Sequence, residues 1–169
     1  MVQLGNIHFG KSETAKPPVV DSGEAFLIWD FLVSRYDNIQ LTQLFQNFAH
    51  DVELKMILKA GLTRLEKQSN KVEDEMNIVQ IPLPNRPPKT LNTDAGSDVW
   101  SDEFIFKLVF TEMQSFLDQH VRTIRSMITN DDLREMFIKF LQDEIDNFDN
   151  LCKFGKLKGW FSNPPLMKH

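Results

Sequence analysis

The sequence is poor in residues that bind metals through sulfur or form covalent cross-links. It contains one cysteine, Cys152, and four histidines among 169 residues. A single cysteine excludes an intramolecular disulfide and every zinc or iron–sulfur site that needs several thiolates. Positive charge is also in the minority, because the formal net charge is -5. Binding to nucleic acid needs clustered positive charge, and we therefore expect no nucleic-acid partner.

Long apolar runs are missing as well. The longest stretch without a charged residue extends from Asn38 to His50 and is rich in Gln and Asn. A membrane-spanning helix needs about 20 mostly apolar residues, and a signal peptide needs an apolar segment that Met1 to Lys11 do not provide. We expect an intracellular protein with no membrane span and no secretory signal. Hydrophobic residues still make up 41% of the chain, which is enough for the core of one domain.

Apolar residues recur at steps of three and four in four long segments, which is the spacing of a helix face. The predicted helices cover residues 22–48, 51–78, 98–128 and 131–155. Asp21 and Glu24 have the spacing of a capping box at the start of the first helix. No alternating pattern of useful length indicates a strand. The sequence therefore predicts an all-α bundle over residues 22–160.

The same spacing predicts which residues face the core. In the first helix these residues are Phe26, Trp29, Leu32, Val33, Tyr36, Ile39, Leu44 and Phe48. In the third helix they are Phe106, Val109, Phe110, Met113, Leu117, Val121, Ile124 and Ile128. Burial of one such face on each helix requires the helices to pack side by side.

Three segments lie outside the predicted helices. Residues 1–21 have no sustained pattern and are expected to form an N-terminal arm. Residues 160–169 are expected to form an apolar tail, with Trp160, Phe161 and Pro164-Pro165, that docks on the bundle. Residues 80–97 contain several prolines, which cannot lie inside a helix. A linker of this length spans up to about 60 Å and a helix is about 42 Å long, so the linker can cross the bundle. A bundle with one long crossover between its second and third helices is ferritin-like.

One segment of the arm matches the phosphate-binding loop motif. Residues Gly5 to Ser12 fit the pattern G-x-x-x-x-G-K-S. A functional loop of this kind follows a buried strand and opens a helix, so that backbone N–H groups point at the phosphates. Here only Met1 to Leu4 precede the motif, and Pro17 and Pro18 follow it closely. We interpret the match as a chance occurrence in the arm.

A ferritin-like bundle raises the question of a di-metal site. Such a site takes a Glu from each of two helices and a Glu-x-x-His from each of the other two. No histidine of the sequence has a Glu three positions before it. We therefore expect neither a complete di-metal site nor a bound cofactor, and no catalytic residue is predicted.

A reduced site around Glu144 is the alternative. Glu144 falls on the predicted apolar face of the fourth helix, and a buried carboxylate is costly unless another group pairs with it. If the second and third helices run parallel, Gln68 lies level with Glu144, and Glu112 and His120 are further partners. These residues are the candidates for holding a single divalent metal. The interpretation that we favour is that Glu144 hydrogen-bonds to Gln68, Tyr36 or water, or leans toward solvent.

Several short motifs in a fixed order resemble a known family. They are Trp29 with Tyr36, Ile81-Pro82-Leu83-Pro84, Trp100-Ser101-Asp102, Asp132-Leu133-Arg134, Asp143-Glu144 and Asn163-Pro164-Pro165. Together, over roughly residues 22–165, they resemble the uncharacterised ferritin-like proteins of endospore-forming bacilli that are similar to spore coat protein F. The resemblance implies a ferritin-like bundle, an association with the spore coat and no established activity. Family members often carry a His at the position of Gln68, so its absence here argues against inherited metal binding.

Three functions are compatible with these observations. The first is a non-enzymatic structural or interaction protein, such as a spore coat component, with a homo-oligomer or other coat proteins as partners. The alternative is a metal-binding protein or metalloenzyme with a reduced site around Glu144. The third is a carrier of an apolar ligand. We rank it last, because it requires a cavity and well-packed cores rarely contain one.

Overall fold

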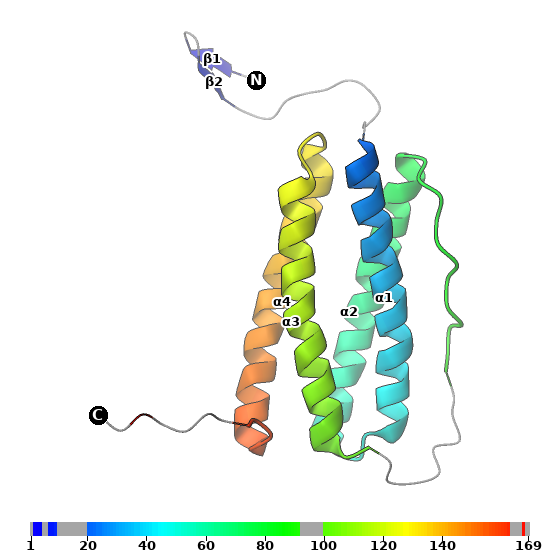
Figure 1. Ribbon diagram of the computed structural model, residues 1–169, viewed down its shortest axis with the longest axis vertical. Helices are drawn as coiled ribbons and strands as arrows, with labels where there is room; N and C mark the ends of the chain where they lie inside the picture. Colours follow the sequence, from blue (N-terminus) through cyan, green and yellow to red (C-terminus); the bar gives the residue numbers. More distant parts are fainter. Residues whose placement is uncertain (1, 5–6, 10–19, 92–99, 163–166, 168–169) are drawn as a thin grey trace.

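The computed structural model describes residues 2–4, 7–9, 20–91, 100–162 and 167 (Figure 1). Four long helices dominate these residues: α1 (Ser22–Phe48), α2 (Val52–Ile78), α3 (Asp102–Ser126) and α4 (Asp131–Lys158). The prediction of four long helices is confirmed. Within the described ranges, no helix combines the length and the apolarity that crossing a lipid bilayer requires.

The helices lie side by side, and their directions require a long return of the chain. α1 packs on α2, α3 packs on α4, and α1 also contacts α3. α2 and α3 run in the same direction (Figure 1), so the chain travels back along the bundle between them. Part of this return is residues 79–91, which run beside α1; residues 92–97 of the predicted linker lie outside the described residues.

Polar side chains of α1 and α2 hold the returning segment against the bundle. The amide nitrogen of Gln43 donates to the Lys89 carbonyl at 2.9 Å. Arg86 forms an ion pair with Glu73 of α2 at 3.3 Å, and Glu73 also accepts a hydrogen bond of 2.7 Å from the Tyr36 hydroxyl. The segment is therefore attached along its length.

The ends of two helices differ from the predicted bounds. α3 begins at Asp102 rather than at residue 98, and its N-cap is Ser101. The Asp102 carboxylate contacts the turn between α1 and α2, where it accepts hydrogen bonds from the backbone N–H groups of His50 and Asp51 at 2.7 and 2.9 Å. α4 continues to Lys158, because Gly159 supplies the left-handed conformation (φ 69°) that ends it.

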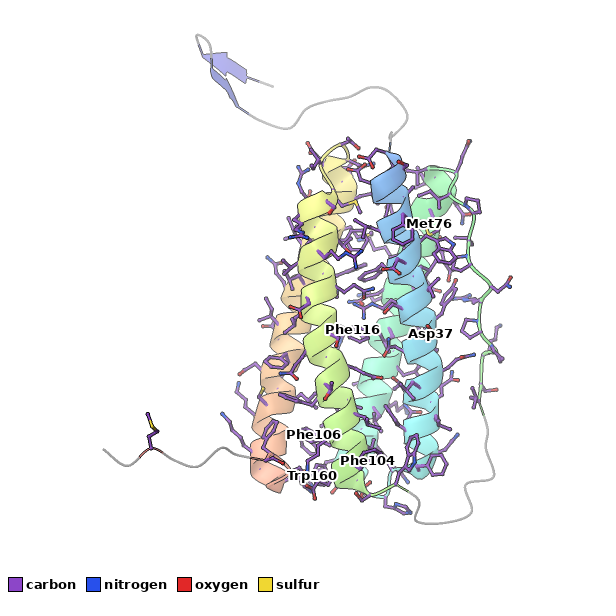
Figure 2. The ribbon with its side chains drawn as sticks, in the orientation of Figure 1. Asp37, Met76, Phe104, Phe106, Phe116 and Trp160 are labelled. Carbon is purple, nitrogen blue, oxygen red and sulfur yellow. The ribbon has the colours of Figure 1, made fainter. Side chains whose placement is uncertain are left out.

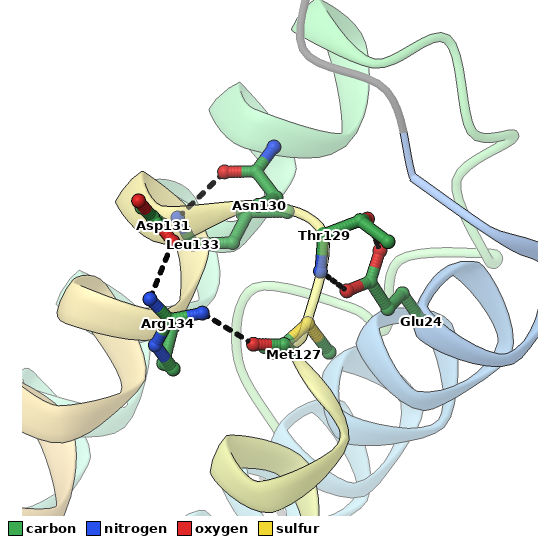
Figure 3. Close-up of polar contacts among 7 residues, drawn as sticks. All are labelled: Glu24, Met127, Thr129, Asn130, Asp131, Leu133 and Arg134. Carbon is green, nitrogen blue, oxygen red and sulfur yellow. Dashed lines mark hydrogen bonds and ion pairs between the residues drawn. The ribbon is translucent and has the colours of Figure 1, made fainter. Parts of the chain in front are cut away.

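Both ends of the bundle are closed by polar contacts between helices. At one end, Glu24 forms the predicted capping box with Asp21, and its carboxylate also accepts hydrogen bonds from the backbone N–H (2.7 Å) and the hydroxyl of Thr129 (Figure 3). At the other end, Lys158 of α4 forms 2.6 Å ion pairs with Asp51 and Glu53 at the start of α2. Each turn is therefore tied to a helix far away in the sequence.

The α3–α4 turn carries further contacts of its own. Asn130 is the N-cap of α4, and its side chain accepts a hydrogen bond of 3.0 Å from the backbone N–H of Leu133. Arg134 donates to the Met127 carbonyl at 2.8 Å and pairs with Asp131 (Figure 3). These bonds satisfy backbone groups that helix ends leave open.

The predicted buried faces of α1 and α3 are right in part: Leu32, Tyr36, Ile39 and Phe106 are buried as predicted, but other predicted residues are exposed. Phe26 and Trp29 were expected in the core, but 56% and 39% of their surface is exposed. Val121 of α3 is likewise exposed, and so is Ile128, which lies beyond the end of α3 at Ser126 instead of inside the predicted helix. The fully or nearly buried residues include Leu27, Ile28, Phe31, Leu32 and Arg35 in α1, and Ile105, Phe106, Phe116, His120 and Thr123 in α3. α1 carries apolar residues on nearly all sides, so their spacing does not determine its rotation.

A short hairpin near the N-terminus was not predicted. Strands β1 (Val2–Leu4) and β2 (Ile7–Phe9) pair antiparallel, with Leu4 opposite Ile7. β2 lies inside the segment that matches the phosphate-binding motif, and such a motif would require a loop there. Residues 5–6 and 10–12 of the motif lie outside the described residues. Strands of three residues are too short to produce a recognisable alternation.

Trp160 and Phe161, at the start of the C-terminal tail, pack on α3, whereas Pro164 and Pro165 of the predicted tail lie outside the described residues. Their ring centroids lie 5.6 and 5.3 Å from the ring of Phe106, and Phe161 is 4.9 Å from Phe110. Phe106 and Trp160 lie together at the lower end of the bundle (Figure 2). Gly155 makes this packing feasible, because a Cβ atom there would lie 2.2 Å from Phe106 and 2.6 Å from Phe161.

Candidate functional site

A cavity of about 190 Å³ lies in the middle part of the bundle, lined mainly by α2, α3 and α4. One end of it is apolar and includes Ile57 and Leu58 of α2 together with Met113 of α3. The lining also includes Arg64 and Gln68, which lie further along α2. The cavity therefore has an apolar part and a polar part along the bundle axis.

Three of the four predicted site residues meet at this cavity. They are Gln68 of α2, Glu112 of α3 and Glu144 of α4. Gln68 and Glu144 are only 3% and 5% exposed. Among the residues that the structure describes, the side-chain nitrogen of Gln68 has no hydrogen-bond partner, and Glu144 makes no hydrogen bond or ion pair. Tyr36, a predicted partner of Glu144, binds Glu73 instead.

Burial changes the ionisation of both carboxyl groups. Loss of contact with water raises the pKa of Glu112 to about 7. Burial also raises the pKa of Glu144, while the positive charges of Arg35 and Arg64 oppose the rise. Glu112 is therefore partly protonated at neutral pH and is able either to donate or to accept a hydrogen bond.

Arg35, which was not predicted, is the most unusual residue of the core. It is completely buried in α1, and its guanidinium carbon lies 4.4 and 4.1 Å from the ring centroids of Phe31 and Phe116. Phe116 lies near the middle of α3 (Figure 2). Burial lowers the pKa of Arg35 to about 10, so the side chain is still a cation at neutral pH. Within the described part of the chain, its Nε and Nη1 atoms have no hydrogen-bond partner.

His120, the fourth predicted site residue, pairs with Arg35 and does not line the cavity. Its Nδ1 lies 2.8 Å from the carbonyl oxygen of Phe116, and its Nε2 lies 3.1 Å from Nη2 of Arg35. The same Nη2 is 3.5 Å from Nδ1, and we assign the shorter contact as the hydrogen bond. Burial and the charge of Arg35 lower the pKa of His120 to about 4. The neutral ring thus donates from Nδ1 and accepts at Nε2, and both nitrogens are in use.

The sequence does contain a signal for Arg35. It stands four residues after Phe31 and four before Ile39, and both of those residues are buried. A charged residue between two core residues at helical spacing lies on the buried face. This signal was missed because Phe31 was not among the residues predicted to face the core.

The comparisons with known proteins agree with the helical fold. Residues 9–169 match a family model for a protein of unknown function, DUF3231. The chain belongs to this family. The DUF3231 chain is also similar to the crystal structure of a putative spore coat protein from Bacillus halodurans, with a TM-score of 0.81 and 22% identity over 88% of this chain and 96% of that one. A comparison with curated proteins finds no match.

The cavity of this DUF3231 protein offers an incomplete set of metal ligands. The described residues contain no group of three or more His, Cys, Asp or Glu side chains that could hold a metal ion. Glu112 and Glu144 contribute carboxyl groups, but both ring nitrogens of His120 are hydrogen-bonded outside the cavity. Arg64 adds a positive charge to the lining. Such a site is better suited to hydrogen bonds with an organic group than to metal coordination.

Proposed function

We propose that this DUF3231 protein is a non-enzymatic structural or interaction protein of the spore coat, built on a ferritin-like bundle related to spore coat protein F. The similarity in fold to the Bacillus halodurans protein and the long return between α2 and α3 support this assignment. Val121, Ile138 and Ile145 on α3 and α4 are exposed, so they are available for contact with a second copy or with other coat proteins.

The buried pair of Arg35 and His120 is the observation that supports a non-enzymatic role. Ferritin-like enzymes place carboxylates and imidazoles in the bundle core around two metal ions. Here the core contains a fixed guanidinium, and the imidazole uses both nitrogens within the protein. A positive charge in a medium of low dielectric constant repels a metal cation strongly. The alternative, one divalent metal held by Glu144, Glu112 and Gln68, is favoured only by their shared cavity.

Metal analysis separates the two functions. The purified full chain is incubated with Fe²⁺, Mn²⁺ or Zn²⁺, freed of unbound ions and measured by elemental analysis. We expect much less than one metal ion per chain, and the same value for Glu144→Ala and for the matched surface variant Asp143→Ala. One ion per chain that is lost in Glu144→Ala but kept in Asp143→Ala would contradict the proposal and establish the metal site.

The coat assignment is tested in sporulating cells of the source organism. A fusion of the full chain to a fluorescent protein is expected to form a ring around the forespore and to remain with the coat fraction of purified spores. The same fluorescent protein without the chain is the control. Diffuse fluorescence in the mother cell, with none in the coat fraction, would refute the coat assignment.

A further inference from the structure

One residue that lines the cavity is Gly61, a glycine in the interior of α2. Glycine is unfavourable inside a helix relative to alanine. No packing contact requires it here, because a Cβ atom at this position would have no atom within 4 Å. A side chain at Gly61 would instead extend into the cavity that Gly61 lines. The sequence thus keeps a weaker helix at a point where a larger residue would fill the space.

The polar part of the cavity has hydrogen-bond donors without acceptors. The side-chain nitrogens of Gln68 and Asn147 are buried and have no partner among the described residues. Arg64, a half-buried residue that also lines the cavity, forms no hydrogen bond or ion pair within that part of the chain. Buried donors are nearly always paired in native proteins, and an unpaired one is costly. A group that satisfies all three must bring acceptor oxygens, and the guanidinium favours a negative charge on them.

The volume limits the size of this group. An engineered cavity of about 150 Å³ binds benzene, and the cavity here is about 190 Å³. It therefore has room for one ring or a short branched chain with a single polar substituent. The apolar surface for such a group is provided by Ile57, Leu58 and Met113 beside Gly61.

We propose that this cavity binds a small apolar carboxylate, with its carboxylate at Arg64, Gln68 and Asn147 and its apolar part beside Gly61. This inference goes beyond the proposed function, because a coat component does not need a bound small molecule. Glu112 is compatible with it: burial raises its pKa to about 7, so its protonated carboxyl is able to donate to the ligand. Burial also raises the pKa of Glu144. An amine of the same size could pair with Glu112 or Glu144, but it would face the positive charge of Arg64 and leave the donors of Gln68 and Asn147 unpaired, which disfavours it.

Fluorine NMR on the full chain tests the ligand class with three probes of nearly equal shape. They are 4-fluorobenzoate, 4-fluorobenzyl alcohol and 4-fluorobenzylamine. We expect saturable binding of the benzoate, binding of the alcohol about tenfold weaker because a neutral group forms weaker hydrogen bonds with a guanidinium, and weaker binding still of the amine. Preference for the amine, or no saturable binding of any probe, would overturn the proposal.

Two pairs of variants test the position of the site. Gly61→Leu should abolish binding by filling the cavity, whereas Thr63→Leu on the exposed side of α2 should leave it unchanged. Arg64→Gln should weaken benzoate about tenfold but hardly affect the alcohol, and Lys67→Gln, an exposed charge on the same helix, should affect neither. A circular dichroism spectrum and melting curve verify that each variant is folded. Unchanged benzoate binding by folded Gly61→Leu would place the probe elsewhere and refute the site.

Discussion

Replacing Arg35 by alanine is expected to lower the free energy of unfolding by about 3 kcal/mol, within the range of large-to-small substitutions in cores. The substitution removes a completely buried side chain that lies against Phe31 and Phe116. It also leaves Nε2 of His120 without its donor. Urea denaturation followed by circular dichroism measures the change.

Arg35→Met is the matched control for this prediction. Methionine keeps most of the volume but removes the charge and, like alanine, leaves Nε2 of His120 without its donor. Because no large cavity forms, we expect Arg35→Met to lower the free energy of unfolding by about 1 kcal/mol, the cost of one unpaired buried acceptor. If methionine were as destabilising as alanine, the charge and the hydrogen bond of Arg35, rather than its packing, would stabilise the core.

Gly155→Ala is expected to lower the free energy of unfolding by about 1–3 kcal/mol, as overpacking of a core does. The new Cβ atom would overlap the ring of Phe106, which is completely buried, so the ring or the helix has to shift. Alanine is intrinsically better than glycine in a helix by about 1 kcal/mol, so the steric effect has to exceed this gain. Urea denaturation measures stability, and tryptophan fluorescence reports whether Trp160 leaves its place beside Phe106.

Gly61→Ala provides the opposite result in the same protein. Its Cβ atom would meet nothing within 4 Å, so only the helix preference acts, and we expect stability to rise by about 0.5–1 kcal/mol. A gain of stability in both variants would show that the tail can move away from Gly155 at little cost.

The helices could be predicted from the sequence because their apolar spacing extends over many turns. Their ends were harder to place: Asp102 is an acidic residue of the first turn of α3, but its contact with the backbone of the α1–α2 turn could not be predicted. Long-range contacts of this kind leave no local signal. The prediction that Phe26 and Trp29 are buried was wrong for a similar reason. The return segment and α3 cover parts of the α1 surface that the spacing of apolar residues alone did not distinguish.

The candidate site was predictable only in part. Glu144 stood out because a carboxylate on an apolar helix face is rare, and its level in the bundle indicated Gln68 as a neighbour. The role of His120 was not predictable, because it depends on Arg35 from another helix. The cavity itself could not be predicted from the sequence either, since it depends on how closely α2 and α4 approach each other.

The polar ties at both ends of the bundle determine where the protein can open. Glu24 fastens α1 to the α3–α4 turn, and Lys158 fastens the end of α4 to the start of α2. Isolated helices fray from their ends, but here the ends are secured and the emptiest region is the middle. Local opening should therefore separate α2 from α4 near the middle of the bundle while both ends stay closed. A solute would then enter the interior between these two helices.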